Sequence, residues 1–180
     1  DAAVVKRQVE HEENREDQER QEEDRIGQQE SVRHQGPAPG LLAPQPGERV
    51  LELGTGSGYQ AAILASLGVC VTSLERHAEL ADRARDRLDA LGLGAKVEIR
   101  SGDGSLGDPG GAPYDGIIVT AAAPSIPTEL RDQLGEGGRL VIPVGPRDRQ
   151  VLMRVVRHGN EWRETPHGAC VFVPLIGPGG

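Results

Sequence analysis

Short apolar runs alternate with longer stretches of mixed polarity along most of the chain. The runs are rich in Val, Ile and Leu and lie at 50–53, 69–75, 96–104, 114–124 and 139–145. Runs of this kind are typical of buried strands, and the unbroken Ile-Ile-Val at 117–119 suits a strand covered on both faces. With helices between the runs, the pattern predicts an α/β fold with a doubly wound, mostly parallel sheet that binds ligands at the carboxyl ends of its strands.

Three connections between these runs have the spacing of helices. The second helix is predicted to end at Gly92, and the third to begin at Pro127 and to end at the glycines from position 135 onward. The side chains expected to pack on the sheet are Ala61, Ile63, Leu64 and Leu67 in the first, Leu80, Ala84, Leu88 and Leu91 in the second, and Leu130 and Leu134 in the third.

The last part of the chain has no helical pattern. Two apolar runs are joined directly, and the His-Gly-Asn at 158–160 supplies a turn between the first run and the segment that carries Trp162. This arrangement predicts that a C-terminal antiparallel hairpin closes one edge of a Rossmann-like sheet, with Trp162 as a packing residue of the hairpin.

The first 35 residues are highly charged, and their central part is free of apolar side chains. They hold eleven acidic and six basic residues, with no apolar residue between Glu10 and Arg25. Because such a segment has no face to bury, we expect residues 1–35 to be disordered or to form a solvated helix. Residues 36–48 are rich in Pro and Gly and are predicted to be a linker, which leaves 49–177 as the folded domain.

Composition excludes several functional classes. The formal net charge of -8 disfavours nucleic acid as the main partner, because phosphate binding requires a basic face. No apolar stretch has the length of a membrane span and no signal peptide opens the chain, so we expect a cytoplasmic protein. Cys70 and Cys170 lie in apolar runs and are predicted to be buried, reduced thiols, and the five His residues show no metal-ligand spacing.

The sequence ELGTGSG at 52–58 places an acid near the end of the first predicted strand and a glycine turn directly after it. Gly54, Gly56 and Gly58 allow close approach of a ligand to the backbone, and the start of the following helix attracts an anionic group. A dinucleotide-binding loop has the order G-x-G-x-x-G, whereas Tyr59 occupies the last of those positions here. The spacing therefore argues against a pyrophosphate and leaves a simple turn as the alternative to a binding loop.

Six motifs in order resemble those of the protein-L-isoaspartate O-methyltransferase family. They are ELGTGSGYQAA, LER at 74–76, GDG at 102–104, APYDGIIVTAAAPSIP at 112–127, LGEGGRLVIPVG at 134–145 and VFVPLIG at 171–177. The likeness runs from about Pro46 to Gly177. It implies the class I methyltransferase fold, with S-adenosyl-L-methionine as the cofactor.

The resemblance also implies roles for individual residues. Glu52 and the turn with Gly54, Thr55, Gly56 and Gly58 would face the methionine end of the cofactor. Glu75 would accept hydrogen bonds from the ribose hydroxyls, Asp103 would accept from the adenine amino group, and Gly104 would let the base approach the backbone. Thr120 follows the fourth strand, where the methyl group and its acceptor would meet.

The resemblance implies methylation of the carboxylate of L-isoaspartyl residues in damaged proteins, which is a repair reaction. An isoaspartyl carboxylate has a pKa near ~4, so it is already ionised at neutral pH and requires no general base. No residue is therefore assigned as catalytic, and no metal is expected. The expected partners are isoaspartyl proteins or peptides, without nucleic acid or membrane, and we expect a monomer.

One segment departs from the family pattern. Upstream of its first strand the family carries a segment similar to G-Q-T-I-S-Q-P-Y, whereas residues 25–37 of this chain read RIGQQESVRHQGP. Ser31 is the only residue with a side-chain hydroxyl before Arg49. Two functions stay open as a result: an active isoaspartyl methyltransferase, or an S-adenosylmethionine-binding module with weak or no activity.

Overall fold

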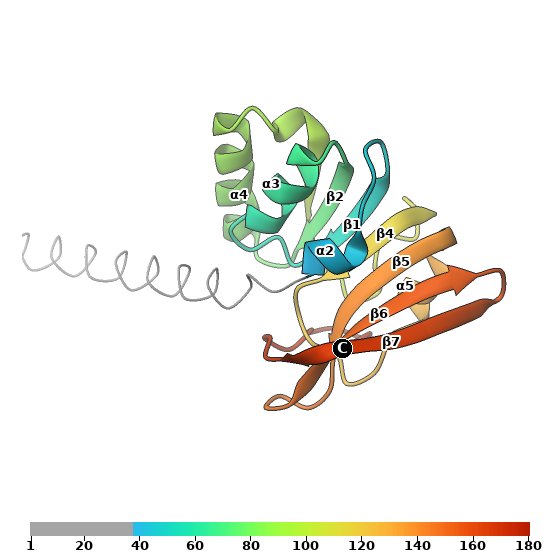
Figure 1. The fold of residues 1–180 in the computed structure, drawn as a ribbon. Helices are drawn as coiled ribbons and strands as arrows, with labels where there is room; N and C mark the ends of the chain where they lie inside the picture. Colours follow the sequence, from blue (N-terminus) through green and yellow to red (C-terminus); the bar gives the residue numbers. More distant parts are fainter. Residues whose placement is uncertain (1–37) are drawn as a thin grey trace, which may run out of the picture. The chain divides into compact units, whose positions relative to one another are not determined.

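The computed structural model describes residues 38–180. Its strands are β1 (Arg49–Leu53), β2 (Cys70–Glu75), β3 (Val97–Ser101), β4 (Tyr114–Val119), β5 (Leu134–Val144), β6 (Gln150–His158) and β7 (Glu161–Cys170). They form one seven-stranded sheet in the order β3-β2-β1-β4-β5-β6-β7 (Figure 1). The first five strands are parallel to one another, and β6 and β7 add an antiparallel hairpin at one edge. The predicted fold class is confirmed.

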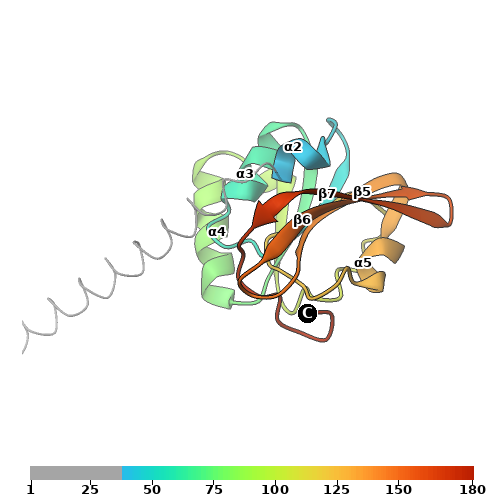
Figure 2. The ribbon, with the colours of Figure 1, turned by 60° about the horizontal axis from the view of Figure 1, so that its bottom comes forward.

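Helices cover both faces of this sheet. They are α2 (Ala38–Leu42), α3 (Tyr59–Ser66), α4 (Ala78–Ala90) and α5 (Thr128–Asp132), with one 3₁₀ turn at Gly94–Lys96. Figure 2 shows α2 and α5 on opposite sides of the sheet. The buried side chains accordingly form two clusters, one that joins α2, α3 and α4 to the sheet and one that contains Leu130 of α5. Trp162 packs against the second cluster, as the hairpin prediction requires.

The buried face of α4 differs from the predicted one. Leu80 is 36% exposed and Leu91 is 64% exposed, whereas Ala81, Ala84 and Leu88 are buried. Ala84 and Leu88 are thus buried as predicted, Ala81 is buried in place of Leu80, and Leu91 lies beyond Ala90, the last residue of the helix. The glycine turn packs on this face, since a Cβ at Gly58 would lie 3.3 Å from the Cβ of Ala84. In α3, Ala61 and Leu64 are buried as predicted, but Leu67 at its end is exposed.

The prediction that both thiols are buried is wrong. Cys70 is exposed and Cys170 is half-buried, and both are free. Val69 and Val71 are buried on either side of Cys70, so the two-residue period of the strand directs the thiol to the opposite side. Cys170 ends β7, which is the edge strand of the sheet and is covered less than the central strands.

Two boundaries also differ from the prediction. The glycines at 135, 137 and 138 lie in the first, irregular part of β5, which begins at Leu134 and shifts its register against β4 between Tyr114 and Gly116. The predicted linker contains the helix α2, and its Leu42 is fully buried against the sheet. Residues 1–37 lie outside the described residues, so the division of the chain into segments 1–35, 36–48 and 49–177 stays a prediction.

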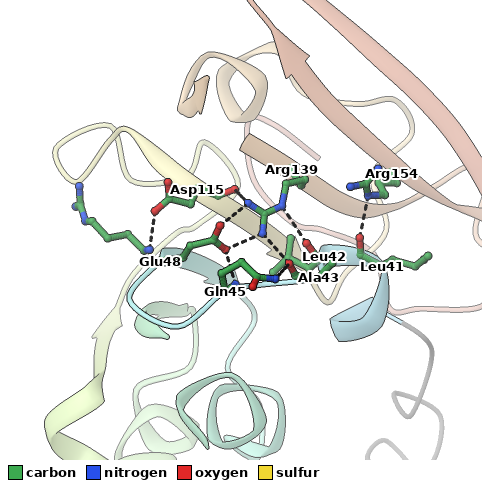
Figure 3. Close-up of polar contacts among 9 residues, drawn as sticks. Leu41, Leu42, Ala43, Gln45, Glu48, Asp115, Arg139 and Arg154 are labelled. Atoms are coloured by element: carbon green, nitrogen blue, oxygen red, sulfur yellow. Dashed lines mark hydrogen bonds and ion pairs between the residues drawn. The ribbon is translucent and has the colours of Figure 1, made fainter. Parts of the chain in front are cut away.

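Arg139 of β5 fixes the end of α2 (Figure 3). All five of its N–H groups donate: to the carbonyls of Leu42 and Ala43 at 3.0 Å, to the carbonyl of Asp115 at 3.1 Å, and to the two carboxylate oxygens of Glu48 at 2.9 and 2.7 Å. Arg154 of β6 donates to the carbonyl of Leu41 at 2.9 Å. Carbonyls that a helix end leaves without partners are thus bound by two arginines from the sheet.

Candidate cofactor site at the carboxyl edge of the sheet

The ends of four neighbouring strands bring the predicted site residues together. In the register of the sheet Leu53 of β1 pairs with Leu74 of β2 and with Val119 of β4, and Glu75 of β2 pairs with Ser101 of β3. The chain segments that follow these strands therefore leave the same edge. They carry the glycine turn, Glu75, the Asp103 loop and Thr120.

The glycine turn lies directly against Thr120. Gly54 has a φ of 93°, and a side chain there would overlap the hydroxyl oxygen of Thr120. That hydroxyl lies 3.0 Å from the carbonyl oxygen of Leu53 and 2.8 Å from that of Gly54, where it donates. The turn is further fixed by Gly54 N–H, which donates to the carbonyl of Leu74 at 2.9 Å. Thr120 thus holds the turn to the end of β4.

Glu52 is a fully buried acid beneath this turn. Its Oε2 accepts a hydrogen bond from Ser73, and the hydroxyls of Ser73 and Thr55 are 2.5 Å apart. Its Oε1 has no hydrogen-bond partner among residues 38–180. Burial raises the pKa of Glu52 to about 8 against the opposing effect of the Ser73 hydrogen bond, and the nearby charge of Glu75 adds to the rise.

Glu75 supports the turn from the neighbouring strand. It is buried, and its two carboxylate oxygens accept from the backbone N–H of Gly56 at 2.9 Å and of His77 at 3.0 Å. Because each carboxylate oxygen has two lone pairs, both can accept one further hydrogen bond. Glu75 is therefore able to orient the turn and to bind a ligand hydroxyl at the same time.

Asp103 lies in the loop after β3 and is exposed. Its Oδ1 accepts from the backbone N–H of Ser105 at 2.9 Å, and this hydrogen bond holds the pKa of Asp103 below its ordinary value. Gly104 brings the loop close to the core, since a Cβ there would lie 3.1 Å from Leu74 Cβ and 3.2 Å from Leu53 Cδ2. The loop thus presents an ionised carboxylate next to the ends of β1 and β2.

Comparison with known proteins decides which family this arrangement belongs to. The sequence profile of protein-L-isoaspartate(D-aspartate) O-methyltransferase (PCMT) matches residues 26–179. The chain is a member of this family. The match extends beyond the range 46–177 that carries the six motifs, and it includes Ser31, which lies outside the described residues.

Individual members of the PCMT family agree with this assignment. Protein-L-isoaspartate O-methyltransferase of Methanoculleus marisnigri is 55% identical over 130 residues, which are 72% of this chain and 59% of that protein. A solved protein-L-isoaspartate O-methyltransferase superposes with a TM-score of 0.72 at 28% identity, covering 79% of this chain and 46% of the other. The chain thus spans about three-fifths of the length of the Methanoculleus marisnigri protein.

A further solved structure supports the PCMT fold alone. It is a putative protein-L-isoaspartate O-methyltransferase from Plasmodium falciparum in complex with S-adenosyl-L-homocysteine, with a TM-score of 0.62 and 24% identity over 76% of this chain and 68% of that one.

Two serines of this candidate site were not predicted from the sequence. Ser73 connects Thr55 to Glu52, and the signal for it was a polar residue at an inward position of an otherwise apolar strand. Ser105 holds Asp103, and no pattern in the sequence indicates it. Among residues 38–180 no group of three His, Cys, Asp or Glu could hold a metal ion, and no helix is long and apolar enough to cross a membrane.

Proposed function

We propose that this chain transfers a methyl group from S-adenosyl-L-methionine to the carboxylate of L-isoaspartyl residues in damaged proteins. Membership of the PCMT family supports the reaction class. The single observation that carries the cofactor assignment is the set of three acidic side chains, Glu52, Glu75 and Asp103, at the ends of adjacent strands around one glycine turn. An acidic edge of this kind complements a cationic nucleoside.

The residues present fit S-adenosylmethionine group by group. The orphaned Oε1 of the buried Glu52 is an acceptor suited to the ligand ammonium, and the start of α3 after the glycine turn suits a carboxylate. Glu75 retains acceptor capacity for ribose hydroxyls, and Asp103 is an ionised acceptor for an adenine amino group. When bound, the cofactor supplies an electrophilic methyl group on a sulfonium.

The protein's own contribution is positioning. An isoaspartyl carboxylate is ionised at neutral pH, with a pKa near ~4, so no side chain has to remove a proton from it. Neutralisation of an anion by a cation is favoured where water is excluded, and Ala121, Ala122 and Ala123 after β4 are buried and apolar. Thr120 keeps this segment and the glycine turn in fixed relation. No residue of 38–180 is assigned an acid or base role.

We further propose that the protein acts in the cytoplasm as a monomer on isoaspartyl proteins or peptides, and that neither nucleic acid nor membrane is a partner. The net charge of -8 supports the exclusion of nucleic acid.

Radiolabelled methyl transfer to an isoaspartyl peptide and to its aspartyl twin tests the proposal. We expect labelling of the isoaspartyl peptide only, together with saturable binding of S-adenosylhomocysteine. Equal labelling of both peptides would reject the substrate assignment. Binding of S-adenosylhomocysteine without any labelling would instead identify the chain as a cofactor-binding module, and absence of binding would reject the cofactor.

A further inference from the structure

The segment after β7 is fixed to the end of β4. The side chain of Gln150, which is buried, accepts from Phe172 N–H at 2.6 Å and donates to the Phe172 carbonyl at 3.1 Å. Ala122 N–H then donates to the carbonyl of Val173 at 2.7 Å, and Leu175 N–H donates to the carbonyl of Ala122 at 2.8 Å. The segment therefore contacts Ala122, which lies two residues after Thr120, on the same edge of the sheet as the candidate cofactor site.

The same segment reaches the loop after β3. A Cβ built on Gly177 would lie 2.6 and 2.7 Å from the two carboxylate oxygens of Asp103 and would also overlap the Ser105 hydroxyl. Gly179 N–H donates to that hydroxyl at 3.3 Å, and Ser105 is itself buried. Residues 172–179 thus connect the ends of β4 and β3, and in the sheet order β1 and β2 lie between these strands.

Gly177 is suited to this contact for two reasons. Its φ of 148° is unfavourable for residues with a side chain, and the space that a side chain would need is filled by Asp103 and Ser105. Asp103 is consequently confined between the Ser105 N–H on its own loop and the backbone of Gly177. A carboxylate on an exposed loop would otherwise sample several rotamers, and its confinement reduces the entropy lost on binding a ligand.

We propose that Gly177 is a positioning residue for Asp103, so that the segment 172–179 sets the selectivity of the site for a 6-aminopurine nucleoside. This inference rests on the proposed function, in which Asp103 accepts from the adenine amino group. An ionised carboxylate accepts hydrogen bonds and cannot donate them, so it favours an amino group at purine position 6 and disfavours a carbonyl oxygen there. A carboxylate displaced by a bulkier residue 177 loses this discrimination.

The experiment compares Gly177→Ala with Gly168→Ala by calorimetry of S-adenosylhomocysteine and S-inosylhomocysteine, which carries a carbonyl in place of the amino group. Gly168 has a comparable φ of 127°, but apart from its two chain neighbours no described residue has an atom within 4 Å of a Cβ placed there, which makes it a control for backbone strain. We expect Gly177→Ala to weaken S-adenosylhomocysteine binding about tenfold, the effect of one hydrogen bond to a charged group, and to leave S-inosylhomocysteine nearly unchanged. Gly168→Ala should retain the wild-type ratio of the two affinities.

A double-mutant cycle with Asp103→Ala completes the test. In the Asp103→Ala background, Gly177→Ala should cause no further loss, because the carboxylate that it positions is absent. Ser105→Ala, a smaller change that removes the hydroxyl contacting Gly179, should also lower the affinity ratio and provides the test if Gly177→Ala does not fold. A wild-type ratio in the folded variants, or an equal loss for both ligands, would overturn the inference. If the wild-type chain binds neither ligand, the proposed function itself fails.

Discussion

Ser73 donates a hydrogen bond to the carboxylate of Glu52, an acid without any exposed surface. When Glu52 is ionised, the one hydroxyl hydrogen of Ser73 is engaged there, so Thr55 must supply the hydrogen of the 2.5 Å contact between the two hydroxyls. A series of hydrogen bonds thus connects Thr55 in the glycine turn, through Ser73, to Glu52. The pKa of Glu52 is raised to about 8, chiefly by burial.

This pKa predicts how the stability of the protein depends on pH. In the unfolded chain Glu52 titrates near 4.5, and in the folded protein near 8, so folding takes up a proton between these values. The free energy of unfolding should therefore fall as pH rises through this window, by up to about 1.4 kcal/mol per pH unit from this group. Because glutamine is neutral at every pH, the Glu52→Gln variant should lack this fall in the free energy of unfolding.

Urea unfolding at pH 6 and pH 9 measures the difference. We expect the variant to gain stability relative to the wild type as pH increases. Glu79→Gln is the matched control, since it makes the same substitution at an exposed position on α4 and should follow the wild-type profile. Parallel profiles for wild type and Glu52→Gln would show that Glu52 is ionised in the folded protein at neutral pH.

The sequence was sufficient to predict the parts of the fold that depend on local pattern. Strand and helix alternation, the direction of the strands and the terminal hairpin all follow from the spacing of apolar residues and turns. Glu75 and the glycine turn were predictable as neighbours because consecutive parallel strands end at one edge. The Gly56 N–H that donates to Glu75 is an outcome of that shared edge.

Contacts that depend on the packed structure were not predictable. Helical spacing suggested that α4 buries Leu80 and Leu91 together with Ala84 and Leu88, but Ala81 is buried instead of Leu80, and the helix ends before Leu91. Arg139 and Glu48 are 91 positions apart in the sequence, and either residue alone has the appearance of an ordinary surface charge. The contact of Gly177 with Asp103 likewise requires the completed sheet.

The ion pair of Arg139 and Glu48 should contribute strongly to stability. Both side chains are largely buried, with exposed fractions of 12% and 20%, and hydrogen bonding to Arg139 holds the pKa of Glu48 below 4.5. Arg139→Ala removes the hydrogen bonds to three carbonyls and to both carboxylate oxygens of Glu48, which keeps only the donor Gln45 N–H among residues 38–180. We expect a loss of about 3 kcal/mol in the free energy of unfolding at pH 7. Arg139→Lys should recover only part, because an ammonium cannot reproduce the planar five-donor geometry.

Urea unfolding of both variants checks this expectation, with Arg149→Ala at an exposed position as the control. The stability that Glu48 contributes is present above pH 4.5 and is lost as pH falls through its lowered pKa in the folded state. The difference between wild type and Arg139→Ala should therefore narrow toward pH 3. A difference that is small at pH 7, or that does not change on acidification, would contradict the assigned role of the pair.

The contact of Gly54 with Thr120 predicts a rescue. Gly54→Ala should impair folding and S-adenosylhomocysteine binding, because the new methyl group overlaps the Thr120 hydroxyl and because a φ of 93° is strained for alanine. Thr120→Ala removes the overlapping oxygen but also the hydrogen bonds to the carbonyls of Leu53 and Gly54. The double variant should therefore be more stable than Gly54→Ala alone, while backbone strain keeps it less stable than Thr120→Ala. Unfolding midpoints of the three variants decide the matter: strictly additive losses would show that the two residues do not compete for the same space, and that backbone strain at Gly54 accounts for the whole effect.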